Sequence, residues 1–277
     1  DLFMEEAVGW LTDLKIRGSY GNLGNQSALS DFYPWMNSYD LDAHYSLNGS
    51  LQTGYHQKNY KIATISWEKA RTWGVGIDAT LFGKLTVGLD YYDRKTTGII
   101  MDVPVPAEFG LGAYKDNVGA MVNRGVELTL NYNESWDDWS FGVSANLAYN
   151  KNKVLYLDGV QSLADGDLKV KQVGAAYGTY RLYKTGGFFQ SDEEAKRWQE
   201  KHKNDAGYPF KRDFKAGDLI YMDTNEDGLI NADDRVLCGS SNPSYTFGLN
   251  LSAGYKSIDC SVMLTGVADV KRMIDIN

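Results

Sequence analysis

The sequence of 277 residues carries 28 basic and 36 acidic side chains, a formal net charge of -8, and 13% aromatic residues. This acidic balance argues against a nucleic-acid partner, for which a basic face is expected. Two cysteines are too few for a disulfide scaffold, and no run of eighteen apolar residues predicts a membrane-spanning helix. A membrane β-barrel is still allowed, because its strands are only half apolar.

The first predicted strand lies near the start of the chain. Leu14, Ile16 and Tyr20 alternate with polar residues, and a Gly/Asn-rich loop is expected over residues 20–26. The chain begins with Asp-Leu-Phe, which is neither a signal peptide nor an initiating Met. We therefore expect the sequence to be a fragment of a longer protein.

Residues 31–64 are polar, aromatic and poorly periodic. They predict one or two strands around a long loop that contains His44 and His56. The third histidine, His202, is expected on a surface helix. No histidine lies in a nucleophile-elbow, metalloprotease or redox pattern, so the sequence does not predict an enzyme.

Two β-hairpins in series are predicted from Thr72 to Tyr149, where apolar and polar residues alternate strictly. The polar positions are mostly Gly, Ser, Thr and Asn, and the apolar positions are large and often aromatic. This pattern favours large apolar groups facing lipid and small polar groups facing a wet lumen. The predicted class is therefore all-β, as an antiparallel transmembrane β-barrel. A soluble antiparallel sheet with one buried face is the alternative.

Connection lengths predict the orientation of this barrel. The turns near Gly83 and Trp136 are short, and bacterial outer-membrane barrels have short periplasmic turns and long extracellular loops. The loop Met101–Gly119 is then expected outside the cell. Further strands are predicted from Tyr245 to Tyr255 and from Ile258 to Leu264, the second with Cys260 on its apolar face. A disulfide between Cys238 and Cys260 is disfavoured by the strict geometry of that bond.

Residues 151–243 are predicted to be one large extracellular excursion. Within it, Tyr177–Gln190 is aromatic and Gly-rich and extends a strand beyond the membrane. Ser191 and Glu194 form a capping-box pattern, which predicts a short surface helix to about Lys203 with Trp198 as its anchor. Gly217–Tyr221 reads as another short strand.

One motif in this excursion predicts a metal site. Residues 223–234 read DTNEDGLINADD, which places oxygen donors at the spacing of a calcium loop and a glycine, Gly228, at its sharp turn. Ile230 is expected to point inward and tether the loop. No paired helices flank it, so a structural Ca²⁺ in an extracellular loop is predicted; an ordinary acidic turn is the alternative. The predicted ligands are Asp223, Asn225, Asp227, Leu229 through its carbonyl, Asn231 and Asp234.

Acidic residues on the predicted strands offer a second kind of chemistry. A glycosidase would need two carboxylates at a set separation, which the sequence does not show. Acids that line a wet pore are the simpler interpretation. The candidates are Glu68, Asp78, Asp90, Glu127 and Asp259.

Several short motifs resemble the second half of the barrel of SusC/RagA-like TonB-dependent outer-membrane transporters of Bacteroidota. Their order and spacing hold over nearly all of the chain. They are Leu14-Lys15-Ile16-Arg17-Gly18-Ser19-Tyr20-Gly21 with Gly24-Asn25-Gln26, Trp67-Glu68-Lys69, Asp90-Tyr91-Tyr92-Asp93-Arg94-Lys95-Thr96-Thr97 with Val103-Pro104-Val105-Pro106-Ala107, Asn117-Val118-Gly119 with Asn123-Arg124-Gly125-Val126-Glu127-Leu128, Tyr149-Asn150-Lys151-Asn152-Lys153-Val154, Gly217-Asp218 and Asn242-Pro243-Ser244-Tyr245.

The resemblance implies a complete protein with a 22-stranded barrel in the bacterial outer membrane. This sequence would supply part of that barrel, and the plug domain would lie outside it. A SusD-like surface lipoprotein would cover the mouth, glycans or peptides would be caught between the two, and TonB would pull on the plug. The lid would contact the excursion at Tyr183–Gln190 and at the calcium-like loop.

A different class of function is also compatible with the residues alone. A secreted, calcium-stabilised β-domain that binds polysaccharide would use its aromatic residues as stacking platforms. The small polar face of each strand favours the transport barrel over this alternative.

Overall fold

A computed structural model describes residues 9–27, 29, 33, 35–57, 61–103, 105, 107–158, 162–165 and 168–274. Antiparallel strands dominate it, as the sequence predicts. The chain divides into two compact units. The first comprises residues 1–163, 172–176 and 243–269, and the second comprises residues 164–171, 177–242 and 270–277.

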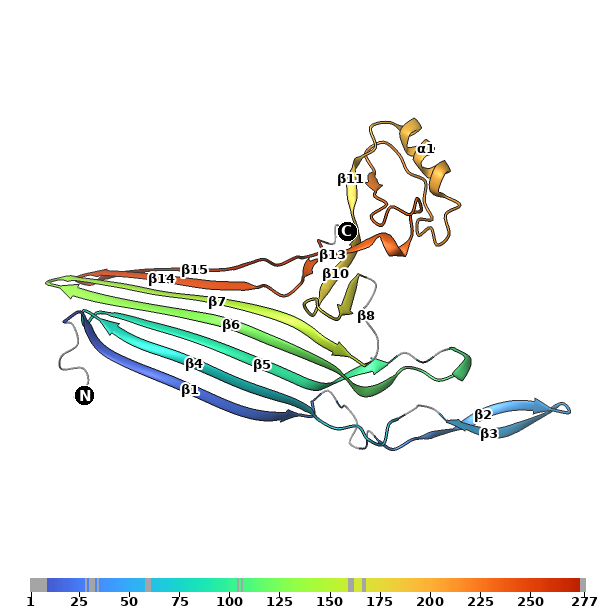
Figure 1. Cartoon of the computed structure of the whole chain (residues 1–277), viewed down its shortest axis with the longest axis horizontal. Coiled ribbons are helices and arrows are strands. Elements are labelled where there is room, and N and C mark those ends of the chain that lie inside the picture. The colour runs from blue at the N-terminus through green and yellow to red at the C-terminus, as the bar shows by residue number, and fades with distance from the viewer. Residues whose placement is uncertain are drawn as a thin grey trace. The chain divides into compact units, whose positions relative to one another are not determined.

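Seven antiparallel strands form the main sheet of the first unit, in the order β1-β4-β5-β6-β7-β14-β15 (Figure 1). The hairpins predicted between Thr72 and Tyr149 are confirmed as β4 to β7, and the two later strands as β14 and β15. The bounds are β1 (Leu11–Asn25), β4 (Glu68–Leu81), β5 (Leu85–Val103), β6 (Tyr114–Trp136), β7 (Trp139–Leu157), β14 (Tyr245–Tyr255) and β15 (Ile258–Ala268).

The register of the strands aligns side chains of similar polarity in continuous rows across this sheet. Since side chains alternate between the two faces, a matched register keeps each face chemically uniform. One apolar row contains Ile16, Ile77, Leu89, Leu128, Leu147 and Phe247. A neighbouring row on the opposite face contains Lys15, Asp78, Gly88, Thr129, Asn146, Gly248 and Thr265.

The apolar face of the sheet is largely uncovered by the described residues. Ile16 is 76% exposed, Leu147 44% and Phe247 45%. In a soluble sandwich, such a face would be buried against a second sheet. An apolar surface this extended indicates contact with lipid, because a soluble monomer rarely exposes one.

Aromatic pairs lie near both ends of this apolar face. Trp139 contacts Tyr255 with ring centroids 4.5 Å apart, and Tyr149 contacts Tyr245 at 4.8 Å. The two pairs are separated by ten residues along both β7 and β14. Ten residues of a tilted strand rise by about 25 Å, the usual height of the apolar band of an outer-membrane barrel. These pairs therefore occupy the positions of the two aromatic girdles.

Several strands extend further than the sequence predicts. β1 continues through the Gly/Asn-rich segment to Asn25. The loop expected over Met101–Gly119 is shorter than predicted, because β5 ends at Val103 and β6 begins at Tyr114, with a short 3-10 turn, η1 (Ala107–Phe109), between them. Pairing with β4 extends β1, because a neighbouring strand outweighs the weak strand preference of Gly and Asn.

A separate hairpin in the first unit consists of β2 (Tyr39–Leu47) and β3 (Ser50–Gln57). Asn48 and Gly49 connect them, both with positive φ, as a type I′ turn requires. His44 and His56 lie in these strands, so their predicted place in a loop is wrong.

The second unit combines short strands with one helix, α1 (Asp192–His202), and a second 3-10 turn, η2 (Ala232–Asp234). A four-stranded sheet has the order β13-β10-β9-β8, and β11 pairs with β12. The helix, the only one of the described part, is neither long nor apolar enough to cross a membrane. The strands are β8 (Ser162–Asp165), β9 (Lys169–Gln172), β10 (Thr179–Tyr183), β11 (Thr185–Phe188), β12 (Leu219–Tyr221) and β13 (Arg235–Ser240).

The predicted helix and its capping residue are confirmed. The Ser191 side chain accepts a hydrogen bond from the Glu194 N–H at 3.2 Å. Trp198 packs against a buried cluster of Phe189, Ala195 and Phe214. His202, expected on the surface, is only 5% exposed, because the aromatic cluster continues along this side of the helix.

We predict that an arginine on the apolar face destabilises the barrel much more than one on the polar face. Leu130→Arg should lower the free energy of unfolding in lipid vesicles by about 2–4 kcal/mol, the cost of a basic side chain near the bilayer midplane. Thr129→Arg, one residue earlier on β6, should cost far less. Urea titrations followed by tryptophan fluorescence measure both, and equal costs would contradict the assignment of the faces.

Candidate functional site

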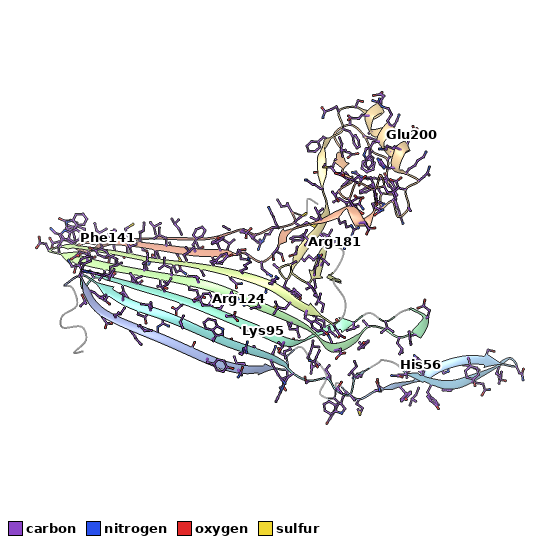
Figure 2. All side chains as sticks on the ribbon, viewed as in Figure 1. His56, Lys95, Arg124, Phe141, Arg181 and Glu200 are labelled. Carbon is purple, nitrogen blue, oxygen red and sulfur yellow. The ribbon has the colours of Figure 1, made fainter. Side chains whose placement is uncertain are left out.

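The polar face of the seven-stranded sheet is the first candidate site, and side chains project from the sheet along its whole length (Figure 2). Its charged residues gather on β1, β4, β5 and the neighbouring part of β6. Among them are Lys15, Arg17, Asp78, Asp90 and Glu127, while Asp259 lies apart from these on β15. Further along β6, and on β7 and β14, small neutral groups take over: Thr129, Asn131, Ser144, Asn146, Asn250 and Ser252.

Arg17 ties three strands of this face together. Its Nε donates to Asp78 Oδ2 at 2.6 Å and its Nη2 donates to Asp90 Oδ2 at 2.8 Å. Because Asp78 lies on β4 and Asp90 on β5, one guanidinium bridges two acids on successive strands and offsets one of their two negative charges. These three side chains remain between 36% and 40% exposed, so water still reaches them.

Glycines of the polar face make room for side chains that lie flat across a neighbouring strand. A Cβ at Gly76 would collide with the Asp90 carboxylate and come within 3.1 Å of Arg17 Cζ. A Cβ at Gly125 would come within 2.5 Å of the Tyr92 ring, whose hydroxyl donates to Asn150 Oδ1 at 3.2 Å. Side chains that lie along the wall leave the space above it open to water.

The structure also decides where each predicted acid lies. By register, Asp78, Asp90, Glu127 and Asp259 lie on the polar face as expected. Glu68 has the same parity as Asp78 on β4 and lies at the end of the sheet, where both of its carboxylate oxygens accept hydrogen bonds. Sequence reasoning missed the role of the glycines, although their alternation on the polar positions was the available signal.

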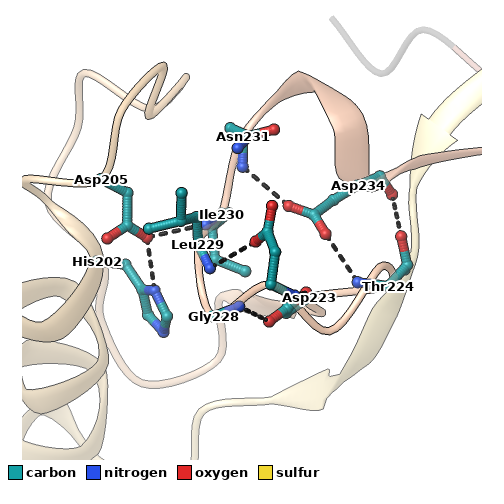
Figure 3. Close-up of polar contacts among 10 residues, drawn as sticks. His202, Asp205, Asp223, Thr224, Gly228, Leu229, Ile230, Asn231 and Asp234 are labelled. Carbon is teal, nitrogen blue, oxygen red and sulfur yellow. Dashed lines mark hydrogen bonds and ion pairs between the residues drawn. The ribbon is translucent and has the colours of Figure 1, made fainter.

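The acidic loop is the second candidate site, and Figure 3 shows its polar contacts. Asp223 accepts from the Gly228 N–H at 2.7 Å, and Asp227 accepts from the Leu229 N–H at 2.8 Å. The Asp227 N–H points at oxygens of both Asp223 and Asn225, at 3.3 and 3.2 Å. Gly228 has a φ of +82°, as the predicted sharp turn requires. The first three predicted ligands are therefore together.

The other end of the loop is closed by Asp234. This residue is fully buried, and its two carboxylate oxygens accept from the N–H groups of Thr224 at 2.7 Å and Asn231 at 2.9 Å (Figure 3). Asn231 in turn caps η2 through the Asp233 N–H. Within the described residues, no group of three or more His, Cys, Asp or Glu is placed to hold a metal ion. Carboxylate, amide and carbonyl oxygens are nevertheless the donors that Ca²⁺ prefers.

A largely buried acid, Asp205, links the loop to the helix, and its side chain is 10% exposed. Asp205 Oδ2 accepts from the Ile230 N–H at 2.8 Å and lies 2.8 Å from His202 Nδ1. Ile230 is 1% exposed, which confirms that it points inward. Burial, together with the charge of Asp205, raises the pKa of the nearby Tyr208 phenol above its ordinary value.

Residues 7–267 match the family model for the TonB-dependent receptor-like β-barrel. The chain belongs to this family. The chain is 31% identical over 257 residues to TonB-dependent receptor P26 of Formosa agariphila, and the matched region covers 92% of this chain and 25% of that protein. It is 24% identical over 275 residues to TonB-dependent receptor SusC of Bacteroides thetaiotaomicron, with 93% and 25% covered.

Solved structures show the same fold. The RagAB peptide transporter superposes with a TM-score of 0.73 at 22% identity, over 97% of this chain and 28% of that one. The chain thus spans about a quarter of the length of the TonB-dependent receptors that it matches. It is part of a barrel wall in a bacterial outer membrane, in a family of receptors and transporters rather than of enzymes.

We predict that Gly76→Ala breaks the Arg17 network of the TonB-dependent receptor. The new methyl group would displace the Asp90 carboxylate, and the overpacking should lower the free energy of unfolding by about 1–3 kcal/mol. Gly88→Ala is the matched control, because its Cβ would meet the nearest atom, Asp78 Oδ1, at an ordinary 3.5 Å. Urea unfolding in vesicles compares them, and equal effects would contradict the prediction.

Proposed function

We propose that this chain forms part of an importer that takes up glycans or other large nutrients, peptides among them, across the outer membrane. The sheet with apolar residues toward lipid and small polar residues toward a lumen carries the proposal, because a water-lined wall suits passage of polar cargo. The chain's membership of the TonB-dependent receptor family supports the same function, and so does the fold that the chain shares with a peptide transporter.

We infer two protein partners for the complete importer. TonB would supply energy through the plug of the complete protein. A SusD-like surface lipoprotein would cover the outer end of the barrel. The short turns at residues 82–84, 137–138 and 256–257 join neighbouring strands of the sheet, and the long connections leave its opposite end. By the usual asymmetry of outer-membrane barrels, these long connections face the lid.

Uptake by living cells tests the import proposal. Deletion of the gene should abolish entry of a fluorescently labelled oligosaccharide or oligopeptide from the panel that the cells consume, and complementation should restore it. Depletion of TonB should leave binding at the surface but stop entry. Uptake that persists without TonB, or a protein absent from the outer-membrane fraction, would overturn the proposal.

We further propose that the acidic loop binds Ca²⁺ as a structural ion. Asp223, Asn225 and Asp227 would supply the first oxygens, the Leu229 carbonyl would follow, and Asn231 and Asp234 would complete the set. Bound Ca²⁺ would offset the repulsion between these carboxylates and stiffen the loop. We place the lid contact at this loop and at Tyr183–Gln190, which begins at the last residue of β10 and contains β11.

Replacement of Asp223 and Asp227 by Ala should weaken calcium binding and lid association together. Calorimetry with CaCl₂ measures the first, with a Kd of about 10⁻⁴–10⁻³ M expected for an extracellular loop. Copurification of the lipoprotein with and without EDTA measures the second. Asp233→Ala, in the same loop but outside the ligand positions, is the matched control. Unchanged complex stability in the double variant and in EDTA would count against the lid contact.

A further inference from the structure

An irregularity in β5 exposes backbone groups at the end of the sheet opposite the short turns. The β5–β6 register shifts between Thr97 and Ile100, and Gly98 has a φ of +65°. Such a β-bulge takes backbone groups out of the ladder, and these groups then need other partners. The Gly98 carbonyl and the Ile100 N–H are the two groups concerned.

Two side chains from separate motifs satisfy these groups. Asn117 donates from Nδ2 to the Gly98 carbonyl at 2.7 Å. Glu68 accepts from the Ile100 N–H at 3.1 Å with Oε1, and from Asn25 Nδ2 on β1 at 3.0 Å with Oε2. Glu68 therefore bridges the two neighbours of its own strand β4.

The same asparagine also holds the segment that leads into β4. Asn117 Oδ1 accepts from the Ser66 N–H at 2.7 Å, and Asn117 Nδ2 donates to the Ser66 carbonyl at 2.7 Å. One side-chain amide thus pairs with both backbone groups of Ser66. Next to it, the Trp67 ring covers Gly24 of β1, where an added Cβ would touch the ring at 3.6 Å. Residues 66–68 are thereby attached to β1, β5 and β6.

We propose that Asn117 and Glu68 are positioning residues that form a rim clamp with Ser66, Gly98 and Ile100. The clamp uses the bulge of β5 to hold the root of the connection 26–67, which carries the β2–β3 hairpin. Residue 66 and the start of β4 are thereby held in place at this end of the sheet. The clamp does not depend on the cargo or partners proposed above.

Hydrogen exchange in the full-length protein tests the clamp directly, because the N–H groups of Ser66 and Ile100 donate two of the hydrogen bonds that form it. Asn117→Ala should speed exchange of the Ser66 amide about fivefold or more relative to the native protein. Glu68→Ala should do the same for the Ile100 amide. Glu68→Gln keeps an acceptor for Ile100 and should restore most of its protection, as Asn117→Asp should for Ser66.

A matched control separates the clamp from general damage to β6. Asn123→Ala removes another hydrogen-bonded asparagine of the same strand, one that contacts Asn152 rather than Ser66. It should leave Ser66 exchange unchanged, whereas Asn117→Ala should also speed trypsin cleavage after Lys61. Equal Ser66 exchange in the Asn117→Ala and Asn123→Ala proteins would overturn the proposal. If the alanine variants do not fold, the Glu68→Gln protein provides the test instead. Fast exchange of the Ile100 amide in folded Glu68→Gln protein would then overturn the proposal.

Discussion

Most of the large apolar side chains of the main sheet lie on one face, and no second layer of protein in the described residues covers that face. Burial of apolar area must then come from hydrocarbon, and hydrocarbon offers no partner for a backbone N–H or carbonyl. The antiparallel ladder satisfies those groups between neighbouring strands. This requirement explains the length and exact register of the strands, since a slip of one residue would turn every apolar side chain of a strand into the lumen.

The polar face follows from the same requirement. Its side chains lie across glycines of neighbouring strands, so that the wall stays thin. The Arg17 network is more than one-third exposed, and exposed ion pairs contribute little to stability. Its three-strand geometry instead aligns β1, β4 and β5 and leaves Glu127, opposite Asp90, as the next acid along the row.

The second unit depends on different forces. An aromatic cluster around Phe189 and Phe214 supplies its core, as in a water-soluble domain. The acidic loop is closed by its own carboxylates, and Asp205 links it to the helix through Ile230. A loop organised in this way presents a defined surface. Specificity in the complete receptor would reside on such surfaces, because loops vary while the barrel wall must satisfy the membrane.

The sequence alone determined the strand faces, the short turns, the capped helix and the calcium-like spacing, because each depends on a period or on neighbouring residues. Only the tertiary structure decided features that join distant segments. Asn117 and Ser66 are 51 residues apart, and Gly76 matters only because Arg17 and Asp90 meet above it. Likewise, β1 reaches Asn25 because β4 pairs with it, and His202 is buried because distant aromatic residues pack beside it. Register and packing create these contacts, and local residue preference carries no record of either.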